Sequence, residues 1–278
     1  MNIVYFGTDA FLNVFEYFKK EHNILALYTY HNNEDYFTER SIVQLAHISG
    51  IPVHYEKITE QQIVEFTESK GCELFFVAEY SSKIPIPKGL KNFRGINTHS
   101  ALLPQGRSYY PIEITMAKHC SIGGVTLHKL AESLDSGDIL AQNSFDIQPQ
   151  DDSIDVYLKC AIAAKTMLAE IMTDFEGFWK NAKVQTTTLP YWKRPTVEEM
   201  LITHDMTVSI AMERYRCFNK MSMVTIDAMP HYIHSLMPGN VPIGNTDKDI
   251  IIINDRRVLF GLADGHIRID IEPAQTEK

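Results

Sequence analysis

The sequence predicts an α/β fold, with a Rossmann-like, mostly parallel sheet in an N-terminal domain and a smaller, mostly β C-terminal domain. Through the first half of the chain, short apolar runs alternate with amphipathic stretches, and this alternation is typical of a parallel sheet covered by helices. After residue 95 the pattern changes to two adjacent strand-like runs and a long helical run. The last part of the chain carries several β-like runs and one helix.

The first half is expected to alternate strands and helices up to a strand that ends at His99. Continuous apolar runs predict strands at 3–6, 24–30, 51–54, 73–78 and 95–99. Apolar residues at helical spacing predict helices at 10–20, 40–49 and 59–69. The turn Gly7-Thr-Asp9 lacks the glycine spacing of a dinucleotide fingerprint, so we interpret it as a structural turn.

The second half is expected to complete the sheet and then form the smaller domain. It should contain a helix at 111–119, strands at 124–130 and 138–145 that could pair antiparallel, and a long helix at 153–179. That helix opens with Asp151-Asp-Ser153, a good N-cap cluster. Beyond a linker at 185–195, we expect a helix at 205–216 and strands at 223–226, 250–254, 258–262 and 266–271, with a hairpin turn at Asp264-Gly265.

The composition and charge of the chain favour some classes of protein over others. The chain has 278 residues, 45% of them hydrophobic and 22% charged, which is ordinary for a soluble globular protein. Its net charge of −9 argues against a nucleic-acid partner, which usually requires a basic face. The four cysteines are scattered without a Cys-x-x-Cys pair, so reduced thiols are favoured over disulfides or a metal site. The sequence shows neither a signal peptide nor a membrane-spanning segment, so we expect a cytoplasmic protein with no membrane partner.

Three polar residues form the candidate catalytic set. Asn97 and His99 lie two residues apart at the end of a predicted strand, so their side chains can point to the same side. Asp135 lies in a Gly-containing turn before another apolar run. A carboxamide can stabilise an oxyanion, an imidazole can move protons, and a carboxylate can orient that imidazole. A histidine at a strand end is more often structural when considered alone, so the interpretation depends on all three groups, which suit acyl transfer to an amine.

Three sequence blocks carry a family resemblance. The first is Asn97-Thr-His99 followed by Ser-Ala-Leu-Leu-Pro104 and Gly106-Arg107. The second is Gly124-Val-Thr-Leu-His128, and the third is Leu134-Asp-Ser-Gly-Asp-Ile-Leu140. In order and spacing they resemble the folate-dependent formyltransferases, a family that includes methionyl-tRNA formyltransferase, glycinamide ribonucleotide transformylase and the enzymes that formylate amino sugars on nucleotide carriers. The resemblance covers roughly residues 1–200.

The resemblance implies a donor, a donor site and a division of labour between the domains. The formyl donor would be 10-formyltetrahydrofolate, with no metal. Its pterin would lie near the backbone of Ser82, Lys83, Ile84 and Pro85 and near the turn at Asp135. Residues 1–188 would form the catalytic domain, and residues 189–278 a smaller α+β domain that could hold a homodimer together. Candidates for that interface are Met221-Ser-Met223 and the β edge at 250–253.

The acceptor is inferred by elimination. The tRNA branch is expected to carry a basic insertion where this chain has a short acidic segment at 31–40, and the purine-synthesis branch normally ends after the first domain. We therefore favour a nucleotide-linked amino sugar, such as a dTDP-linked amino-dideoxyhexose. A methionyl-tRNA or another small amine as acceptor, a formyltetrahydrofolate hydrolase and a non-catalytic folate- or nucleotide-binding protein remain alternatives.

Acceptor contacts are expected from two aromatic segments. The candidates are Gly106, Arg107, Tyr109, Tyr110, Trp192 and Lys193. The tyrosines could stack on a base or line the sugar pocket, and Arg107 could meet phosphate or fix the loop. Tyr191 and Arg194 could contribute stacking and charge in the same way. Helix packing explains the tyrosines about as well, linkers often carry such residues without a function, and His128 is interpreted as a core or pocket-wall residue.

Overall fold

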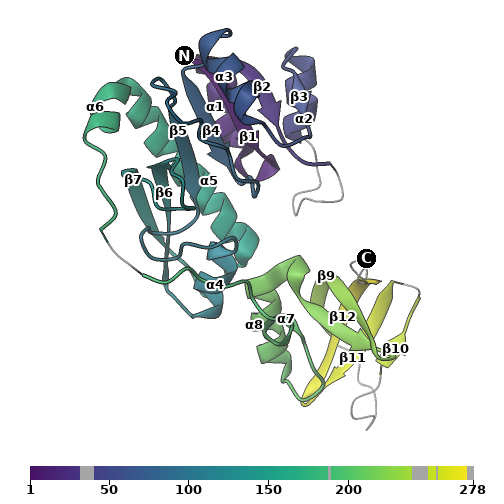
Figure 1. The fold of residues 1–278 in the computed structure, drawn as a ribbon. Helices are drawn as coiled ribbons and strands as arrows, with labels where there is room; N and C mark the ends of the chain where they lie inside the picture. The colour runs from purple at the N-terminus through teal and green to yellow at the C-terminus, as the bar shows by residue number, and fades with distance from the viewer. Residues whose placement is uncertain (32–40, 187–188, 240–249, 255, 274–278) are drawn as a thin grey trace. The chain divides into compact units, whose positions relative to one another are not determined.

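A computed structural model describes residues 1–31, 41–186, 189–239, 250–254 and 256–273. The chain forms two compact units (Figure 1). The first unit comprises residues 1–115, 121–147 and 156–193, and the second comprises residues 116–120, 148–155 and 194–278. The acidic segment that bears on the choice of acceptor lies, from residue 32 to residue 40, outside the described residues.

A seven-stranded sheet organises the first unit, and it confirms the predicted Rossmann-like architecture. Its order is β3 (Val53–His54), β2 (Asn23–Tyr28), β1 (Asn2–Gly7), β4 (Leu74–Ala78), β5 (Gly95–His99), β6 (Ile122–Lys129) and β7 (Ile139–Asp146). The first five strands run parallel, whereas β6 pairs antiparallel with both β5 and β7. The two antiparallel strands therefore extend the parallel sheet at one edge.

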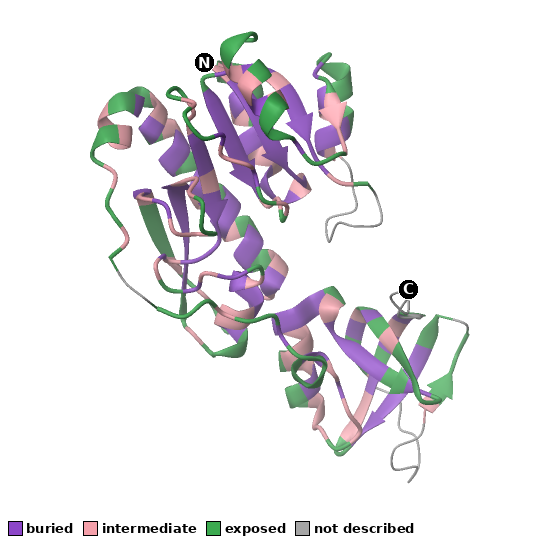
Figure 2. Cartoon of the chain, in the orientation of Figure 1, coloured by how far each residue is buried: buried purple, intermediate pink, exposed green. Residues whose placement is uncertain are grey.

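Helices cover both faces of this sheet. The first unit contains η1 (Asp9–Phe11), α1 (Leu12–Glu21), α2 (Ser41–Ile48), α3 (Glu60–Glu68), α4 (Pro111–Ala117), α5 (Ser153–Thr173) and α6 (Phe175–Lys180), where α4 and α5 each reach into the second unit. Phe66 of α3 packs with Val77 in one apolar cluster, and Phe18 of α1 contacts Phe76 on the other face. Asn13 of α1 donates to the Ala161 carbonyl of α5 at 2.9 Å, which places α5 beside α1. Strands β1, β4, β5 and β6 are mostly buried, whereas much of the edge strand β7 is exposed (Figure 2).

Local geometry at the ends of two elements explains one success and one error of the sequence analysis. The Asp9 carboxylate accepts from the N–H groups of Ser41 and Ile42 at the start of α2, so the first turn is structural, as predicted. The single helix predicted at 153–179 is wrong, because α5 ends at Thr173. The Asp174 side chain accepts from the Gly177 N–H and caps α6, so it starts a new helix instead of continuing the old one.

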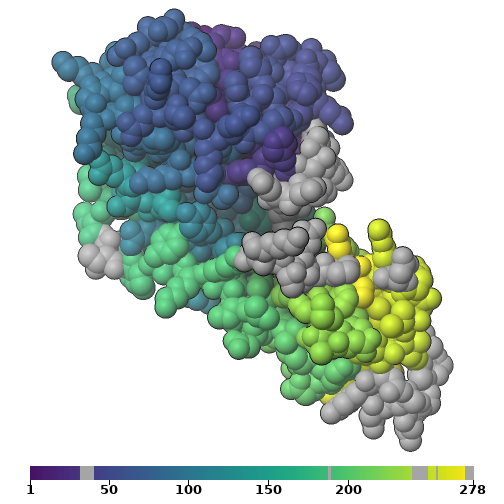
Figure 3. Space-filling model, turned by 45° about the vertical axis from the view of Figure 1, so that its right-hand side comes forward, coloured from purple at the N-terminus to yellow at the C-terminus, as the bar shows by residue number. Residues whose placement is uncertain are grey.

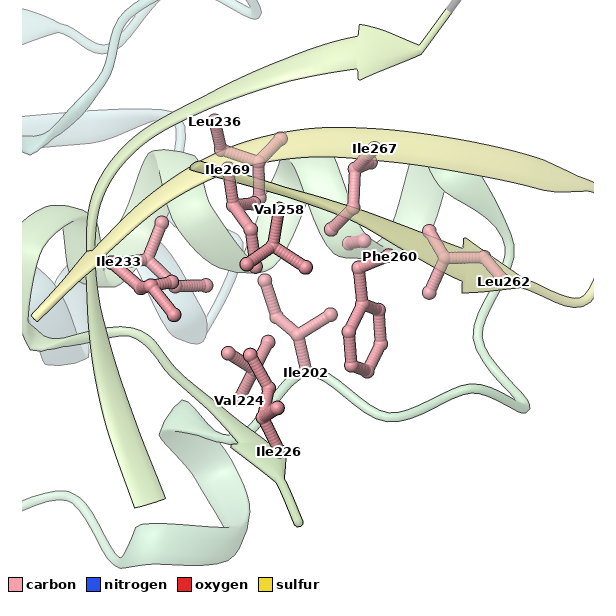
Figure 4. Close-up of a cluster of buried hydrophobic side chains, with 12 residues drawn as sticks. Ile202, Val224, Ile226, Ile233, Leu236, Val258, Phe260, Leu262, Ile267 and Ile269 are labelled. Carbon is pink, nitrogen blue, oxygen red and sulfur yellow. The ribbon is translucent and has the colours of Figure 1, made fainter. Parts of the chain in front are cut away.

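The second unit is built on a five-stranded antiparallel sheet. Its order is β10 (Ile250–Ile252), β11 (Arg257–Leu262), β12 (Gly265–Pro273), β9 (Met229–Gly239) and β8 (Met223–Ile226), with α7 (Val197–Met200), α8 (Val208–Phe218) and η2 (Asn219–Met221). Figure 4 shows its core, which is a single cluster of apolar side chains.

In the space-filling view, the purple-to-teal colours of the first unit form one closely packed body (Figure 3).

Strand β9 lies outside the predicted strands, and part of a candidate dimer interface is buried. Strand β9 contains Pro230 and Pro238, which argue against a strand in sequence because proline cannot donate to a ladder. Both prolines lie next to the ends of the strand, where the loss is tolerated. Met223 is buried in β8, so it belongs to the core, whereas Ile251 and Ile252 of the edge strand β10 are exposed. Among the described residues, no helix is both long and apolar enough to cross a membrane.

Candidate active site

One cavity lies at the carboxyl ends of β4 and β5, where ligands of doubly wound sheets usually bind. The loop after β4, the end of β5, the start of α4, the β6–β7 loop and one residue of the 189–193 segment line it. The lining residues are Val77, Glu79, Tyr80, Ser81, Ser82, Lys83, Ile84, Asn97, Thr98, His99, Ser100, Ser108, Tyr109, Pro111, His128, Leu130, Ala131, Ser133, Leu134, Asp135 and Tyr191. The cavity thus contains all three predicted catalytic residues.

His99 is held between two acceptors. Its Nε2 lies 2.8 Å from the Gly106 carbonyl, and because a carbonyl can only accept, Nε2 carries a proton. Its Nδ1 lies 3.5 Å from the Asp135 Oδ1, an ion-pair distance. Proton exchange at His99 therefore falls to Nδ1, on the side of Asp135. Gly106 has a φ of 80°, and a Cβ there would come within 2.8 Å of the Ala101 Cβ, so the turn that supplies this carbonyl requires glycine.

The turn that carries Asp135 is fixed by its neighbours. Asp135 has a φ of 54°, which is unusual for a residue with a side chain. The Gln185 side chain donates to the carbonyls of Asp135 and Gly137 at 3.0 and 2.7 Å. A Cβ on Gly137 would lie 1.8 Å from the Lys129 carbonyl oxygen, so the turn can pack against β6 only with glycine. Gln185 belongs to the predicted linker, and nothing in its sequence context indicates this role.

Asn97 is paired with a second histidine. In the antiparallel β5–β6 ladder Asn97 lies opposite His128, so both side chains share one face of the sheet. The His128 Nε2 is 3.1 Å from the Asn97 Nδ2. Burial, reinforced by the charge of His99, lowers the pKa of His128 to about 4, although Asp135 opposes the shift. The interpretation of His128 as a pocket-wall residue is incomplete, because the imidazole also contacts the candidate catalytic amide.

The predicted donor loop reaches the cavity in part. Ser82, Lys83 and Ile84 line it, whereas Pro85 is not among the lining residues. The Ser82 N–H is donated to the Tyr30 hydroxyl at 3.0 Å, so this backbone group is engaged within the protein. Thr98, between the two candidate catalytic residues, also lines the cavity, and its buried hydroxyl has no hydrogen-bond partner among the described residues.

The predicted acceptor residues divide into two groups. Tyr109 lines the cavity, whereas the remaining candidates (Gly106, Arg107, Tyr110, Trp192 and Lys193) are not among the lining residues. The Arg107 guanidinium donates to the Leu189 carbonyl, and the Trp192 N–H donates to the Arg107 carbonyl at 2.8 Å. These bonds hold the 189–193 segment against the loop before α4, which corrects its interpretation as a plain linker. The Arg107 guanidinium thus fixes the loop, which is one of its two expected roles, and the phosphate contact stays a prediction.

The residue that this segment contributes to the cavity is Tyr191. Its ring meets the ring of Tyr109 edge to face, with centroids 6.2 Å apart. The neighbouring Trp192 ring lies 3.4 Å from the position of a Cβ on Gly106. Neighbouring side chains of an extended segment point in opposite directions, and this alternation is the signal that could have separated Tyr191 from Trp192.

An acidic group lies beside the cavity that the sequence analysis did not consider. Glu79 lines the cavity, and the Tyr157 hydroxyl lies 3.4 Å from carboxylate oxygens of both Glu79 and Glu113. Burial raises the pKa of Glu113 to about 7, so near neutral pH this carboxyl holds a proton part of the time.

Within the described residues there is no cluster of three His, Cys, Asp or Glu side chains that could hold a metal ion.

Comparison with known sequences identifies relatives over much of the chain. A family model described as formyl transferase matches residues 14–172. The methionyl-tRNA formyltransferase of Acinetobacter baumannii is 26% identical over 269 residues, covering 89% of this chain and 82% of the relative. That of Lactobacillus acidophilus is 27% identical over 151 residues, covering 53% of this chain, and the match spans about half (48%) of the relative's length.

Solved structures with the same fold include a crystal structure of HypX from Aquifex aeolicus in complex with tetrahydrofolic acid. It has a TM-score of 0.68 at 16% identity, and the match covers 99% of this chain and 44% of that chain. Another is the N-formyltransferase from Helicobacter canadensis in complex with folinic acid and dTDP-3-aminofucose, with a TM-score of 0.62 at 20% identity over 98% of this chain and 99% of that chain. Because the formyl transferase model matches more than half of the chain, the protein belongs to the folate-dependent formyltransferase family.

Proposed function

We propose that the protein transfers the formyl group of 10-formyltetrahydrofolate to the amine of a nucleotide-linked amino-deoxy sugar. The observation that carries this proposal is the convergence of Asn97, His99 and Asp135 on one cavity, with His99 Nδ1 3.5 Å from Asp135 Oδ1. Asn97 and His99 come from the end of β5 and Asp135 from the turn between β6 and β7, and each group offers a different property that formyl transfer requires.

The reaction can be written with all protons accounted for. The acceptor nitrogen attacks the formyl carbon and forms a C–N bond, which places negative charge on the formyl oxygen. An N–H of Asn97 stabilises this oxyanion. The tetrahedral intermediate then breaks its bond to N10 of the folate. The acceptor nitrogen loses one proton and N10 gains one, and His99, exchanging protons at Nδ1 beside Asp135, serves both transfers. The products are a formamide and tetrahydrofolate.

The donor and acceptor are proposed to occupy different parts of the cavity wall. The loop at Ser82–Ile84 and the turn at Asp135 would hold the pterin of the donor. Tyr109 and Tyr191 offer aromatic surfaces at the acceptor side, where a sugar ring or a base can pack against them. The net charge of −9 also favours a small acceptor over tRNA, and the Helicobacter canadensis enzyme was crystallised with a dTDP-linked amino sugar.

A second candidate acceptor is methionyl-tRNA. It is favoured by the relatives from Acinetobacter baumannii and Lactobacillus acidophilus, both of which are methionyl-tRNA formyltransferases. A tRNA acceptor predicts a rate that falls steeply with added salt, because phosphate contacts release counterions. A nucleotide-linked sugar, which carries two phosphates, predicts a much weaker dependence on salt.

The proposal is tested by incubating the protein with 10-formyltetrahydrofolate and a panel of dTDP-, UDP- and GDP-linked amino sugars, with methionyl-tRNA in a parallel reaction. We expect tetrahydrofolate to form only when one of the sugars is present, and expect His99→Asn to abolish its formation. Formation with methionyl-tRNA alone would replace the acceptor, and formation without any acceptor would indicate a hydrolase. Folate binding without turnover with any partner would indicate a binding protein.

A further inference from the structure

The tautomer of His128 is fixed by the backbone of β6. His128 Nδ1 lies 2.8 Å from the carbonyl oxygen of Lys129. A carbonyl oxygen has no hydrogen to donate, so this contact is a hydrogen bond only if Nδ1 carries the proton. The neutral imidazole must then carry a lone pair on Nε2.

The surroundings of His128 keep it neutral. Its side chain is only 2% exposed, and burial disfavours the charged form. His99, with a ring centroid 6.4 Å away, opposes a second positive charge nearby, while the Asp135 carboxylate, 3.9 Å from Nε2, opposes the shift only in part. Among the described residues, His99 and Asp135 are the titratable side chains whose charges act on the His128 ring. Across the neutral pH range Nε2 therefore stays an acceptor.

This acceptor determines which way the Asn97 carboxamide points. An amide can present either its oxygen or its NH₂ group to a neighbour, and the two orientations differ by a half-turn. Opposite the Nε2 lone pair, at 3.1 Å, only the NH₂ group forms a hydrogen bond. One N–H of Asn97 is thus donated to His128. Because the amide is planar, the directions of the second N–H and of the oxygen are fixed as well.

We infer that His128 is a positioning residue that sets the orientation of the Asn97 carboxamide through its fixed tautomer. One N–H of Asn97 is held by His128, and the other remains for the formyl oxygen. The catalytic meaning of this orientation rests on the proposed function, but the hydrogen-bond arrangement itself does not. Gly137 supports this arrangement, because its lack of a side chain leaves room for the Lys129 carbonyl that sets the tautomer of His128.

The arrangement can be tested without any substrate by nuclear magnetic resonance of the nitrogen-15-labelled protein. Long-range proton–nitrogen spectra report the charge and tautomer of each histidine, and His128→Gln assigns the signals of His128. We expect a neutral ring with the proton on Nδ1 between about pH 5.5 and 8.5. We also expect a scalar coupling between His128 Nε2 and Asn97 Nδ2 that disappears in Asn97→Ala. A His128 ring that titrates in this range, or that carries its proton on Nε2, overturns the inference.

The effect on the reaction is tested with two substitutions of similar size. His128→Met removes the acceptor, whereas His128→Gln keeps a carbonyl oxygen that can accept from Asn97. We expect His128→Met to lower kcat about a hundredfold with the KM for the donor nearly unchanged, and His128→Gln to recover much of that loss. Equal losses in both variants, with folinic acid still bound, would mean that His128 only fills space.

The matched control is His119→Phe. His119 is exposed, pairs with Glu213 in the second unit, and is not among the residues that line the cavity. This variant should keep both the spectrum of His128 and the turnover of the wild type. The spectra on the unmodified protein decide the orientation of Asn97 even if no acceptor is ever found. A failure of the proposed function and a failure of this inference are therefore distinguishable.

Discussion

The two sheets of this protein differ in the side chains that they bury. The second unit is centred on an apolar cluster that includes Ile233, Phe260 and Ile269, and the polar side chains that it buries, including Asn219 and Ser222, are not part of that cluster. The first unit buries polar side chains on two adjacent interior strands, β5 and β6, including Thr98, His99 and His128. Burying polar groups costs stability unless hydrogen bonds compensate. The apolar cluster of the second sheet therefore favours stability, whereas β5 and β6 give up some stability to present reactive groups.

Removing the His99 imidazole from the first sheet should have the largest effect of the variants considered. We expect His99→Asn to lower formyl transfer about 10²–10⁴-fold, because the proton transfers lose their carrier. The melting temperature should change little, since the new amide can still donate to a backbone carbonyl. Transfer rates at saturating donor and a thermal melt measure the two effects. A variant that keeps a near-normal rate would remove His99 from the mechanism.

A substitution in the core of the second unit should lower stability and leave the rate of formyl transfer unchanged. Phe260→Ala should lower the free energy of unfolding by about 3–5 kcal/mol, because the ring is buried and leaves a cavity. The rate per folded molecule should remain close to that of the wild type. Urea denaturation measures the loss, and Ile252→Ala, at a position 60% exposed, is the control and should change stability by less than about 0.5 kcal/mol. A selective loss of turnover in folded Phe260→Ala protein would contradict the division between the sheets.

A smaller effect is expected at the turn that carries Asp135. Gln185→Leu removes both hydrogen bonds to the carbonyls of that turn, so Asp135 should drift from His99. We expect transfer to slow by about tenfold to a hundredfold with little change in stability. Steady-state kinetics check the first effect, and Val184→Ala, which alters the exposed preceding residue, provides the control. If both variants transfer formyl groups at the same rate, the hydrogen bonds of Gln185 have no role in catalysis.

The smallest expected effect is a change in how stability depends on pH. Burial raises the pKa of Glu113 to about 7, so in the window between about pH 4.5 and 7 the folded protein binds more protons here than the unfolded chain. Glu113 therefore makes stability fall as the pH rises through this window. Glu113→Gln should remove that decrease, which is on the order of 1–3 kcal/mol.

His128 contributes the opposite slope. Its pKa is lowered to about 4, so its contribution to stability is lost as the pH falls from about 6.5 toward 4. The two groups partly cancel in the wild type. Denaturation curves at several pH values measure the slopes, and Glu113→Gln should then expose the loss toward acid pH that His128 causes. An unchanged slope in Glu113→Gln would show that the buried carboxyl has an ordinary pKa.

The sequence predicts the strands of the first sheet well because most of them are continuous apolar runs with clear ends. Asn97 and His99 could be assigned to one face because alternation along a strand is a local property. The error at Asp174 has a local cause as well, since a helix cap within an apolar-periodic stretch resembles an ordinary polar residue. Strand β9 was missed because its two prolines are harmless only at the ends that the sheet itself defines.

The candidate site was predictable only where its geometry is local. The contact between Asn97 and His128 depends on the register of an antiparallel ladder, and the clamp by Gln185 joins residues 50 positions apart. Neither has a signature in a single sequence. The same limit applies to the bond between Arg107 and the Leu189 carbonyl, which joins residues 82 positions apart. Residue types indicated the chemistry, and long-range pairing determined which side chains reach the cavity.

The most direct test of the account is a crystal structure of the protein soaked with folinic acid, a stable formylated folate. We predict the pterin in the cavity beside Ser82–Ile84, with the folate oriented so that its formyl-bearing edge faces Asn97 and His99. Folinic acid bound elsewhere, or bound in the cavity with that edge turned away from both side chains, would contradict the assignment of this cavity as the site of formyl transfer.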